Sequence, residues 1–189
     1  MYKFNSKLVD GQSLIHVINL CLGENLIGAE VGVFKGQTLC TILQNCPKIK
    51  LLYAIDNYKP YSDFLGSQNG NACYSIDEKE IDYIRMTAHH NVKWSGFTDK
   101  VLFLQYDSHY VSKNTQDESL DFVFLDTCMT YEQQVQDLND WYSKVKNGGL
   151  FVGHDWNASE VQNAVLQFRK QHNISKPLST FDNTWMWLK

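Results

Sequence analysis

Glycines and carboxylates at the ends of apolar runs are the residues of this sequence best placed to do chemistry. The segment GAEVGVFKGQT, from Gly28 to Thr38, places Glu30 at the end of an apolar run and then Gly32 and Gly36 at the start of a predicted helix. Glycine lacks a Cβ, so the chain turns sharply and a ligand can reach the main chain, while the first N–H groups of a helix are unpaired. The segment therefore predicts a turn that binds a small cofactor.

The spacing of the glycines distinguishes this turn from a dinucleotide site. Dinucleotide-binding turns follow the pattern G-x-G-x-x-G. Here three residues separate Gly32 from Gly36, and an acid precedes them. This difference favours a ligand without a pyrophosphate, although isolated G-x-x-x-G matches also occur in tight turns and at close packing contacts.

A second candidate ligand follows the next apolar run, from Leu51 to Ile55. The run ends at Asp56, about twenty residues after Gly36, where nucleoside-binding α/β folds place a carboxylate for the ribose hydroxyls. Because one carboxylate can accept from both hydroxyls, Asp56 is the predicted ribose ligand. The alternative is that Asp56 is a turn residue before Asn57, since Asp and Asn favour turns.

Composition and charge exclude several classes of protein. The chain has 189 residues, 43% hydrophobic and 20% charged, which predicts a single globular domain over 1–189. With a net charge of -4 and scattered Lys and Arg, we expect a small-molecule partner and no nucleic acid or membrane. There is no membrane-length apolar run and no secretory signal, which predicts a cytoplasmic location. The five cysteines form no C-x-x-C pair and read as reduced thiols, and a homodimer is compatible with the sequence.

Short apolar runs alternate with helical patterns along the chain. Unalternated apolar runs suit parallel strands that are buried on both faces. Their alternation with helices predicts a doubly wound, Rossmann-like α/β sheet, mostly parallel, with helices on both faces. Asp182-Asn183 predicts an antiparallel hairpin at the C-terminus. The predicted strands are 26–31, 51–55, 101–105, 120–125 and 150–153, with hairpin strands 178–181 and 184–188, and the predicted helices are 13–22, 38–45, 77–94, 131–144 and 159–172.

One connection, 57–76, is too long for a simple crossover. It contains Pro60, Gly66, Gly70 and several aromatic residues. Long ordered loops in compact domains are usually functional. We therefore expect a lid insertion over the cleft, the alternative being that its aromatic residues anchor the loop to the core.

A carboxylate follows each of the five apolar runs. In an open α/β sheet, ligands bind outside the carboxyl ends of the strands. The residues at these ends are Glu30, Asp56, Asp107, Asp126 and Asp155. Their convergence predicts an acidic cleft, suited to a cationic ligand or one bound with the help of a metal.

Taken together, five segments resemble the motifs of the class I S-adenosylmethionine-dependent methyltransferases. In chain order they read EVGVFKGQT, YAID, VLFLQYDS, LDFVFLDTCMTYE and GGLFVGHDW. The likeness is greatest to the small O-methyltransferases of the macrolide-sugar and catechol branch. It implies that the protein binds S-adenosyl-L-methionine and transfers a methyl group to a small-molecule acceptor, at a hydroxyl.

The resemblance also implies a set of cofactor-binding residues. Glu30 and the two glycines would embrace the methionine portion, where the carboxylate favours the ammonium and sulfonium charges. Asp107 and Ser108 would flank the adenine, although both residue types are also good helix N-caps. The whole implied set is Glu30, Gly32, Val33, Phe34, Gly36, Thr38, Asp56, Asn57, Asp107, Ser108 and Asp126.

The catalytic candidates are Asp126, His154 and Asp155. An alcohol is a poor nucleophile, so the site needs a divalent metal or a general base. In metal-dependent relatives acids at the positions of Asp126 and Asp155 bind Mg²⁺, while His154 is the candidate base of a metal-free site. Since neighbours at a strand end tend to point in opposite directions, only one of His154 and Asp155 is expected to face the cleft.

Two other functions remain open on the sequence. A nicotinamide-dependent oxidoreductase shares the glycine turn and the ribose acid, but its third glycine and a Tyr-x-x-x-Lys pair are missing here. A catalytically inactive binding module is the second alternative. It rests on His154 in place of an acid and on Met129 where relatives often have a polar or basic catalytic residue.

Overall fold

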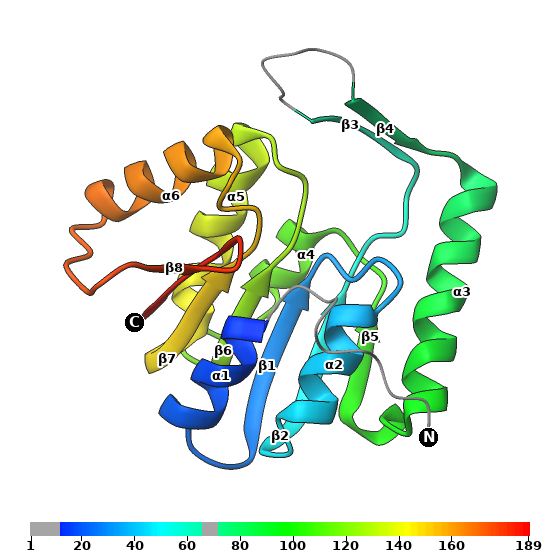
Figure 1. Ribbon diagram of the computed structural model, residues 1–189, viewed down its shortest axis with the longest axis horizontal. Coiled ribbons are helices and arrows are strands. Elements are labelled where there is room, and N and C mark those ends of the chain that lie inside the picture. Colours follow the sequence, from blue (N-terminus) through cyan, green and yellow to red (C-terminus); the bar gives the residue numbers. More distant parts are fainter. Residues whose placement is uncertain (1–11, 66–71) are drawn as a thin grey trace.

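A single seven-stranded sheet organises the protein (Figure 1). The computed structural model describes residues 12–65 and 72–189, and only the backbone within 61–65 and 72–76. The strands of the sheet run in the order β5-β2-β1-β6-β7-β9-β8. They are β1 (Leu26–Val31), β2 (Ile49–Ile55), β5 (Val101–Leu104), β6 (Leu120–Leu125), β7 (Val145–Gly153), β8 (Ser179–Phe181) and β9 (Thr184–Leu188).

The directions of the strands confirm the predicted sheet. The first five pair in parallel, while β9 runs antiparallel to both β7 and β8. Asp182 and Asn183 turn the chain between β8 and β9 with φ of 48° and 60°. Two central residues with positive φ match the right-handed twist of hairpin strands, and Asp and Asn tolerate that conformation well. The short C-terminal strands thus form the expected hairpin.

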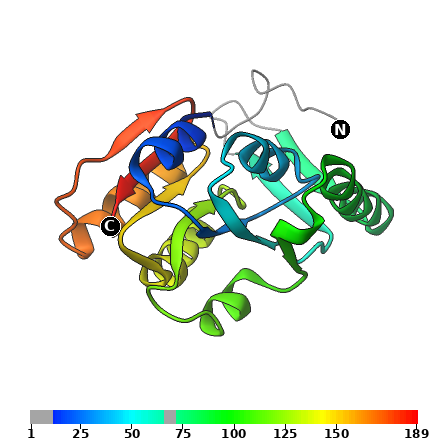
Figure 2. The ribbon, with the colours of Figure 1, turned by 90° about the horizontal axis from the view of Figure 1, so that it is seen from below.

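Helices cover both faces of the sheet, as Figure 2 shows. One core lies between the sheet and α1, α2 and α3, and the other lies between the sheet and α4, α5 and α6. Strand β6 serves both, because Phe122 and Phe124 enter the first core and Val123 and Leu125 the second. Burial on both faces explains the unalternated apolar runs. The helices are α1 (Gln12–Cys21), α2 (Gln37–Asn45), α3 (Glu78–Ser95), α4 (Ser108–Lys113), α5 (Tyr131–Trp141) and α6 (Ser159–Gln171).

Among the residues that the structure describes, no helix combines the length and the apolar character needed to cross a membrane.

Two short 3₁₀ segments also occur in the described part of the chain, η2 (Thr98–Lys100) and η3 (Tyr142–Lys144). The segment η3 ends the helical stretch predicted from 131 to 144. Helix α4 was not predicted, because its six residues show no apolar period.

The long connection after β2 contains a hairpin that the sequence analysis treated as loop. Strands β3 (Tyr61–Leu65) and β4 (Ala72–Ile76) pair antiparallel, with Tyr61 opposite Ile76 and Leu65 opposite Ala72. In Figure 1 the hairpin stands beyond the carboxyl ends of the parallel strands, apart from the main sheet. The connection 66–71 and the side chains of 61–76 lie outside what the structure describes. The expected lid therefore stays a prediction.

A close contact between two strand ends positions the site. Gly32 follows β1 with φ +86°, and a Cβ added there would overlap the backbone carbonyl oxygen of Asp126 after β6. The main chain ties the same region together, because the Gly32 N–H donates to Ile55 and the Asp126 N–H donates to Val31. Only glycine combines the left-handed backbone with so close an approach.

Replacing Gly32 by alanine tests this contact, with Gly148 as the matched control. Gly148 has φ +80° but open space where a Cβ would lie, so Gly148→Ala introduces backbone strain alone, about 1 kcal/mol. Gly32→Ala adds a clash with backbone, and we expect its free energy of unfolding to fall by about 3 kcal/mol or more. Urea denaturation measures both. Equal losses in the two variants would show that the contact with Asp126 is unimportant.

Candidate active site

A cavity of about 600 Å³ opens at the carboxyl ends of the parallel strands. Its walls come from the segments that follow β1, β2, β5, β6 and β7, as expected for an open α/β sheet. The predicted cofactor residues that line it are Gly32, Phe34, Asp56, Asn57, Asp107, Ser108 and Asp126. The remaining predicted cofactor residues, Glu30, Val33, Gly36 and Thr38, do not line it, and all but the half-buried Thr38 are buried. Lining residues absent from the sequence analysis include Lys59, Ile81, Ile84, Tyr106, Thr127 and Gln133.

Asp56 holds the glycine turn in shape. Its Oδ2 accepts hydrogen bonds from the N–H groups of Val33 and Phe34, both at 3.0 Å, and its Oδ1 accepts from the Tyr58 N–H at 2.9 Å. The Tyr58 hydroxyl, below the turn, donates to the Phe34 carbonyl at 3.2 Å. The bond to Tyr58 shows that Asp56 is a turn residue, the alternative that the sequence left open. A carboxylate offers about four acceptor positions, so these three bonds leave about one position, on Oδ1, for a ribose hydroxyl.

Glu30 lies directly beneath the turn with an incomplete set of partners. The residue is 1% exposed, and its Oε2 has no hydrogen-bond partner among the described residues. Burial raises the pKa of Glu30 well above its ordinary value, and the nearby charges of Asp126 and Asp56 raise the pKa further. A buried carboxyl in this state favours a proton or a cation as its partner.

The segment after β5 forms the second side of the cavity. Asp107 caps α4, its Oδ1 accepting from the N–H groups of His109 at 3.1 Å and Tyr110 at 3.4 Å. Ile84 and Tyr106 add apolar surface beside it, which suits a flat, stacked ring such as a nucleobase. Tyr106 lies between β5 and Asp107. This position, just after a predicted strand, was the signal in the sequence that could have identified Tyr106 as a lining residue.

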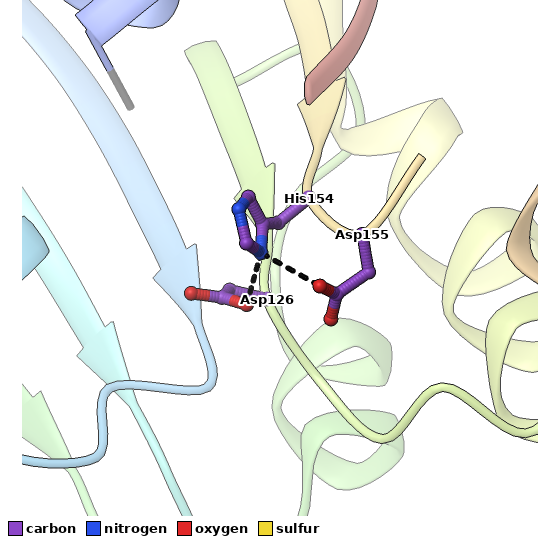
Figure 3. Close-up of side chains that lie close together, drawn as sticks. All are labelled: Asp126, His154 and Asp155. Atoms are coloured by element: carbon purple, nitrogen blue, oxygen red, sulfur yellow. Dashed lines mark ion pairs between the residues drawn. The ribbon is translucent and has the colours of Figure 1, made fainter. Parts of the chain in front are cut away.

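Three catalytic candidates, Asp126, His154 and Asp155, lie close together at one side of the cavity (Figure 3). The Nδ1 atom of His154 lies 3.1 Å from Oδ1 of Asp155 and 3.5 Å from Oδ1 of Asp126. Asp126 and Asp155 line the cavity, whereas the His154 side chain is 10% exposed and lies behind them. Only one member of the pair therefore faces the cavity, as the strand pattern predicts. The other still contacts both acids.

The backbone of Asp155 explains how it turns toward Asp126. Its φ of 57° is left-handed, which breaks the alternation of the strand. The β8–β9 turn supports this conformation: the Asn183 side-chain amide donates to Asp155 Oδ1 at 3.3 Å, and Asn183 Oδ1 accepts from the Asn157 N–H at 2.7 Å. The Trp156 N–H donates to the Asn183 carbonyl at 3.0 Å. Nothing in the sequence connects this hairpin with the site.

The donor set fits a divalent metal ion. One ligand atom from each of Asp126, His154 and Asp155 lies within 4.8 Å of the others. Two ligands at right angles on an ion such as Mg²⁺ lie about 3.0 Å apart, comparable to the observed 3.1 and 3.5 Å. Carboxylates suit Mg²⁺ and Mn²⁺, while an imidazole also suits Mn²⁺, Zn²⁺ and Fe²⁺. The same contacts also fit a protonated imidazole between two acids.

Without a metal, His154 carries a proton at neutral pH. Burial lowers the pKa of His154, but the hydrogen bonds and charges of Asp126 and Asp155 outweigh it and raise the pKa from 6.5 to about 10. A protonated imidazole cannot accept a proton from an alcohol. Together with its place behind the cavity wall, this argues against His154 as a general base at neutral pH.

The side of the cavity around Asp126 combines apolar and polar side chains with the charge of Lys59. Cys128, Met129 and Gln133 line it next to Asp126, and Lys59 and Pro60 line it from the connection after β2. Met129 thus contributes an apolar surface to the cavity beside Asp126.

Comparison with known proteins identifies the family. A family model described as a methyltransferase domain matches residues 29–156. The fold is that of the class I methyltransferases, and the chain belongs to this methyltransferase family, whose members use S-adenosylmethionine as the methyl donor. A search among curated proteins found no match.

Solved structures share the fold at low sequence identity. The O-methyltransferase NovP is 17% identical with a TM-score of 0.66, the match covering 97% of this chain and 79% of NovP. A candidate caffeoyl-CoA O-methyltransferase from Staphylococcus aureus is 13% identical, with a TM-score of 0.66 and coverage of 98% and 83%. Precorrin 8W decarboxylase from Methanobacterium thermoautotrophicum is also 13% identical, with a TM-score of 0.63 and coverage of 100% and 96%. Likeness at this level shows the fold alone.

The ion pairs of His154 predict a pH-dependent contribution to stability. Because the pKa of His154 is raised from 6.5 to about 10 in the folded protein, the stabilisation is complete below about pH 6.5 and is lost as the pH rises toward about 10. We therefore expect the difference in Tm between the wild type and His154→Gln, both freed of metal by a chelator, to shrink over this range. A difference that stays constant with pH would contradict the ion pairs.

Proposed function

We propose that this protein is an S-adenosylmethionine-dependent O-methyltransferase that acts on the hydroxyl group of a small molecule. One observation carries the proposal: the glycine turn and Asp56 share a single cavity with Asp126 and Asp155. The first pair supports a nucleoside with a sulfonium side chain. The second pair supports the acceptor hydroxyl close to the point where that nucleoside would end.

The turn side of the cavity suits the cofactor in shape and charge. Asp56 retains acceptor capacity for the ribose, while Ile84 and Tyr106 offer flat apolar surface for the adenine. Glu30 lies beneath with its unpartnered oxygen, and the positive ammonium and sulfonium groups of the cofactor would relieve the repulsion among the surrounding acids. The grouping of Glu30, Asp56 and Asp126 is the physical reason to favour a cationic cofactor over a dinucleotide.

Methyl transfer from sulfur to oxygen is an in-line displacement, which the protein assists mainly by alignment and exclusion of water. Holding both partners in place contributes several kcal/mol. The apolar wall of Cys128 and Met129 excludes water beside Asp126. The scatter of Lys and Arg along the sequence favours a small acceptor over a nucleic acid.

We further propose that Asp126, His154 and Asp155 hold a divalent cation. Such a cation would lower the pKa of an acceptor hydroxyl and make it nucleophilic at neutral pH. His154 would supply the third ligand atom, and without metal its proton holds both carboxylates in place. This proposal accounts for an imidazole that lies behind the cavity wall, which the metal-free base does not.

The alternative functions make different predictions. A nicotinamide-dependent enzyme would bind NADH in the cavity, and an inactive module would bind the cofactor without turnover. The methyltransferase family and the absence of a dinucleotide glycine pattern favour methyl transfer over hydride transfer. A cytoplasmic location and a homodimer remain predictions from the sequence.

Calorimetric titration with S-adenosylhomocysteine tests the cofactor site. We expect the wild type to bind it and not NADH, and Asp56→Ala to weaken binding by about 1 to 3 kcal/mol through the loss of charged hydrogen bonds. Asp56→Asn keeps an oxygen for the turn amides but loses the charge, so it separates the ribose role from the turn role. Asp99→Ala, an exposed acid, is the control. Unchanged affinity in both Asp56 variants would remove this residue from the ribose site.

Methyl transfer to a panel of hydroxylated acceptors, with and without EDTA, tests the metal. We expect turnover to be lost in EDTA and restored by Mg²⁺ or Mn²⁺, and Asp155→Asn to lower turnover about a hundredfold or more while S-adenosylhomocysteine affinity stays within about threefold. Turnover that survives EDTA would contradict the metal proposal. Cofactor binding without turnover on any acceptor would favour the inactive module.

A further inference from the structure

A buried carboxylate on α5 contacts the site from behind. Asp137 is 0% exposed and does not line the cavity. Its Oδ1 accepts from the Ser108 hydroxyl at 3.0 Å, and its Oδ2 accepts from the Thr127 hydroxyl at 2.7 Å and from the Gln133 side-chain amide at 3.1 Å. All three donors line the cavity. One side chain outside the cavity thus bonds to three residues in its wall.

These donors belong to different sides of the cavity. Ser108 begins α4 after β5, on the side where Ile84 and Tyr106 offer a surface for the nucleobase. Thr127 directly follows Asp126 after β6, on the side of the acid cluster. Strands β5 and β6 are not neighbours, because β2 and β1 lie between them in the sheet. Asp137 bridges segments that the sheet itself does not join.

The directions of these hydrogen bonds are fixed by their neighbours. The Trp141 indole N–H donates to the Ser108 Oγ at 2.8 Å. Since an indole N–H can only donate, the Ser108 hydroxyl must point its own hydrogen elsewhere, and Asp137 is its acceptor. Likewise Gln134 donates through its side-chain amide to the Thr127 hydroxyl at 3.3 Å and to the Cys128 carbonyl at 2.9 Å. The network therefore has one arrangement.

We propose that Asp137 is a positioning residue that couples the nucleoside side of the cavity to the side that holds the acceptor. This inference rests on the proposed function for the identity of the two sides. Hydrogen bonds to an ionised carboxylate are short and strong, so a shift of Ser108 is transmitted through Asp137 to Thr127, and with it to Asp126. A ligand bound on one side of the cavity thereby also fixes the positions of the residues on the other side.

A double-mutant cycle on S-adenosylhomocysteine affinity, measured by calorimetry, tests the coupling. We expect Asp137→Asn to weaken binding about tenfold, within the range of coupling between contacting groups. Thr127→Val should weaken binding about threefold in the wild type and not at all in the Asp137→Asn background. If Thr127→Val has the same effect in both backgrounds, Thr127 acts on the ligand directly and the coupling is refuted.

Controls separate positioning from general stability. Glu132→Gln removes an exposed acid of α5 that does not line the cavity, and we expect its affinity to match the wild type. Asp137→Asn with a lower Tm but wild-type affinity would show a structural role only and overturn the proposal. If Asp137→Asn does not fold, Ser108→Ala and Thr127→Val provide the cycle, and additive effects would overturn the coupling. A wild type that binds no S-adenosylhomocysteine would instead refute the proposed function.

Discussion

The contact between Gly32 and the Asp126 carbonyl is the constraint on which the rest of the site depends. Because no Cβ stands between them, the turn after β1 and the end of β6 approach more closely than side chains would allow. That approach places the glycine turn and Asp126 in the wall of one cavity. Asp56 then fixes the turn from the neighbouring strand, since its carboxylate bonds to two turn amides.

The site gathers more negative charge than its own residues neutralise. Glu30, Asp56, Asp126 and Asp155 lie close together, and His154 is the basic side chain that contacts two of them. Gathering like charges costs free energy that backbone N–H groups and one imidazole offset in part. This repulsion raises the pKa of Glu30 and favours positively charged groups as ligands of the cavity.

The sequence predicted what depends on local pattern and missed what depends on distant contacts. Buried parallel strands leave unalternated apolar runs, so the five central strands and the C-terminal hairpin were predicted, as was the cluster of acids at their ends. The β3–β4 hairpin was missed, although the stretch GSQNGN between its strands resembles a turn. The place of His154 behind the acids and the bonds of Asp137 depend on three-dimensional packing, of which a single sequence carries no trace.

The C-terminal hairpin, β8 and β9, contacts the cavity residue Asp155 through its turn. Asn183, in its left-handed turn, bonds to the Asp155 side chain and to the backbone of the next two residues. The orientation of that acid is thus set partly by a segment that arrives almost thirty positions later and forms the outer border of the sheet. Substitutions in this hairpin would accordingly reorient Asp155 without altering the glycine turn or Asp56 on the opposite wall of the cavity.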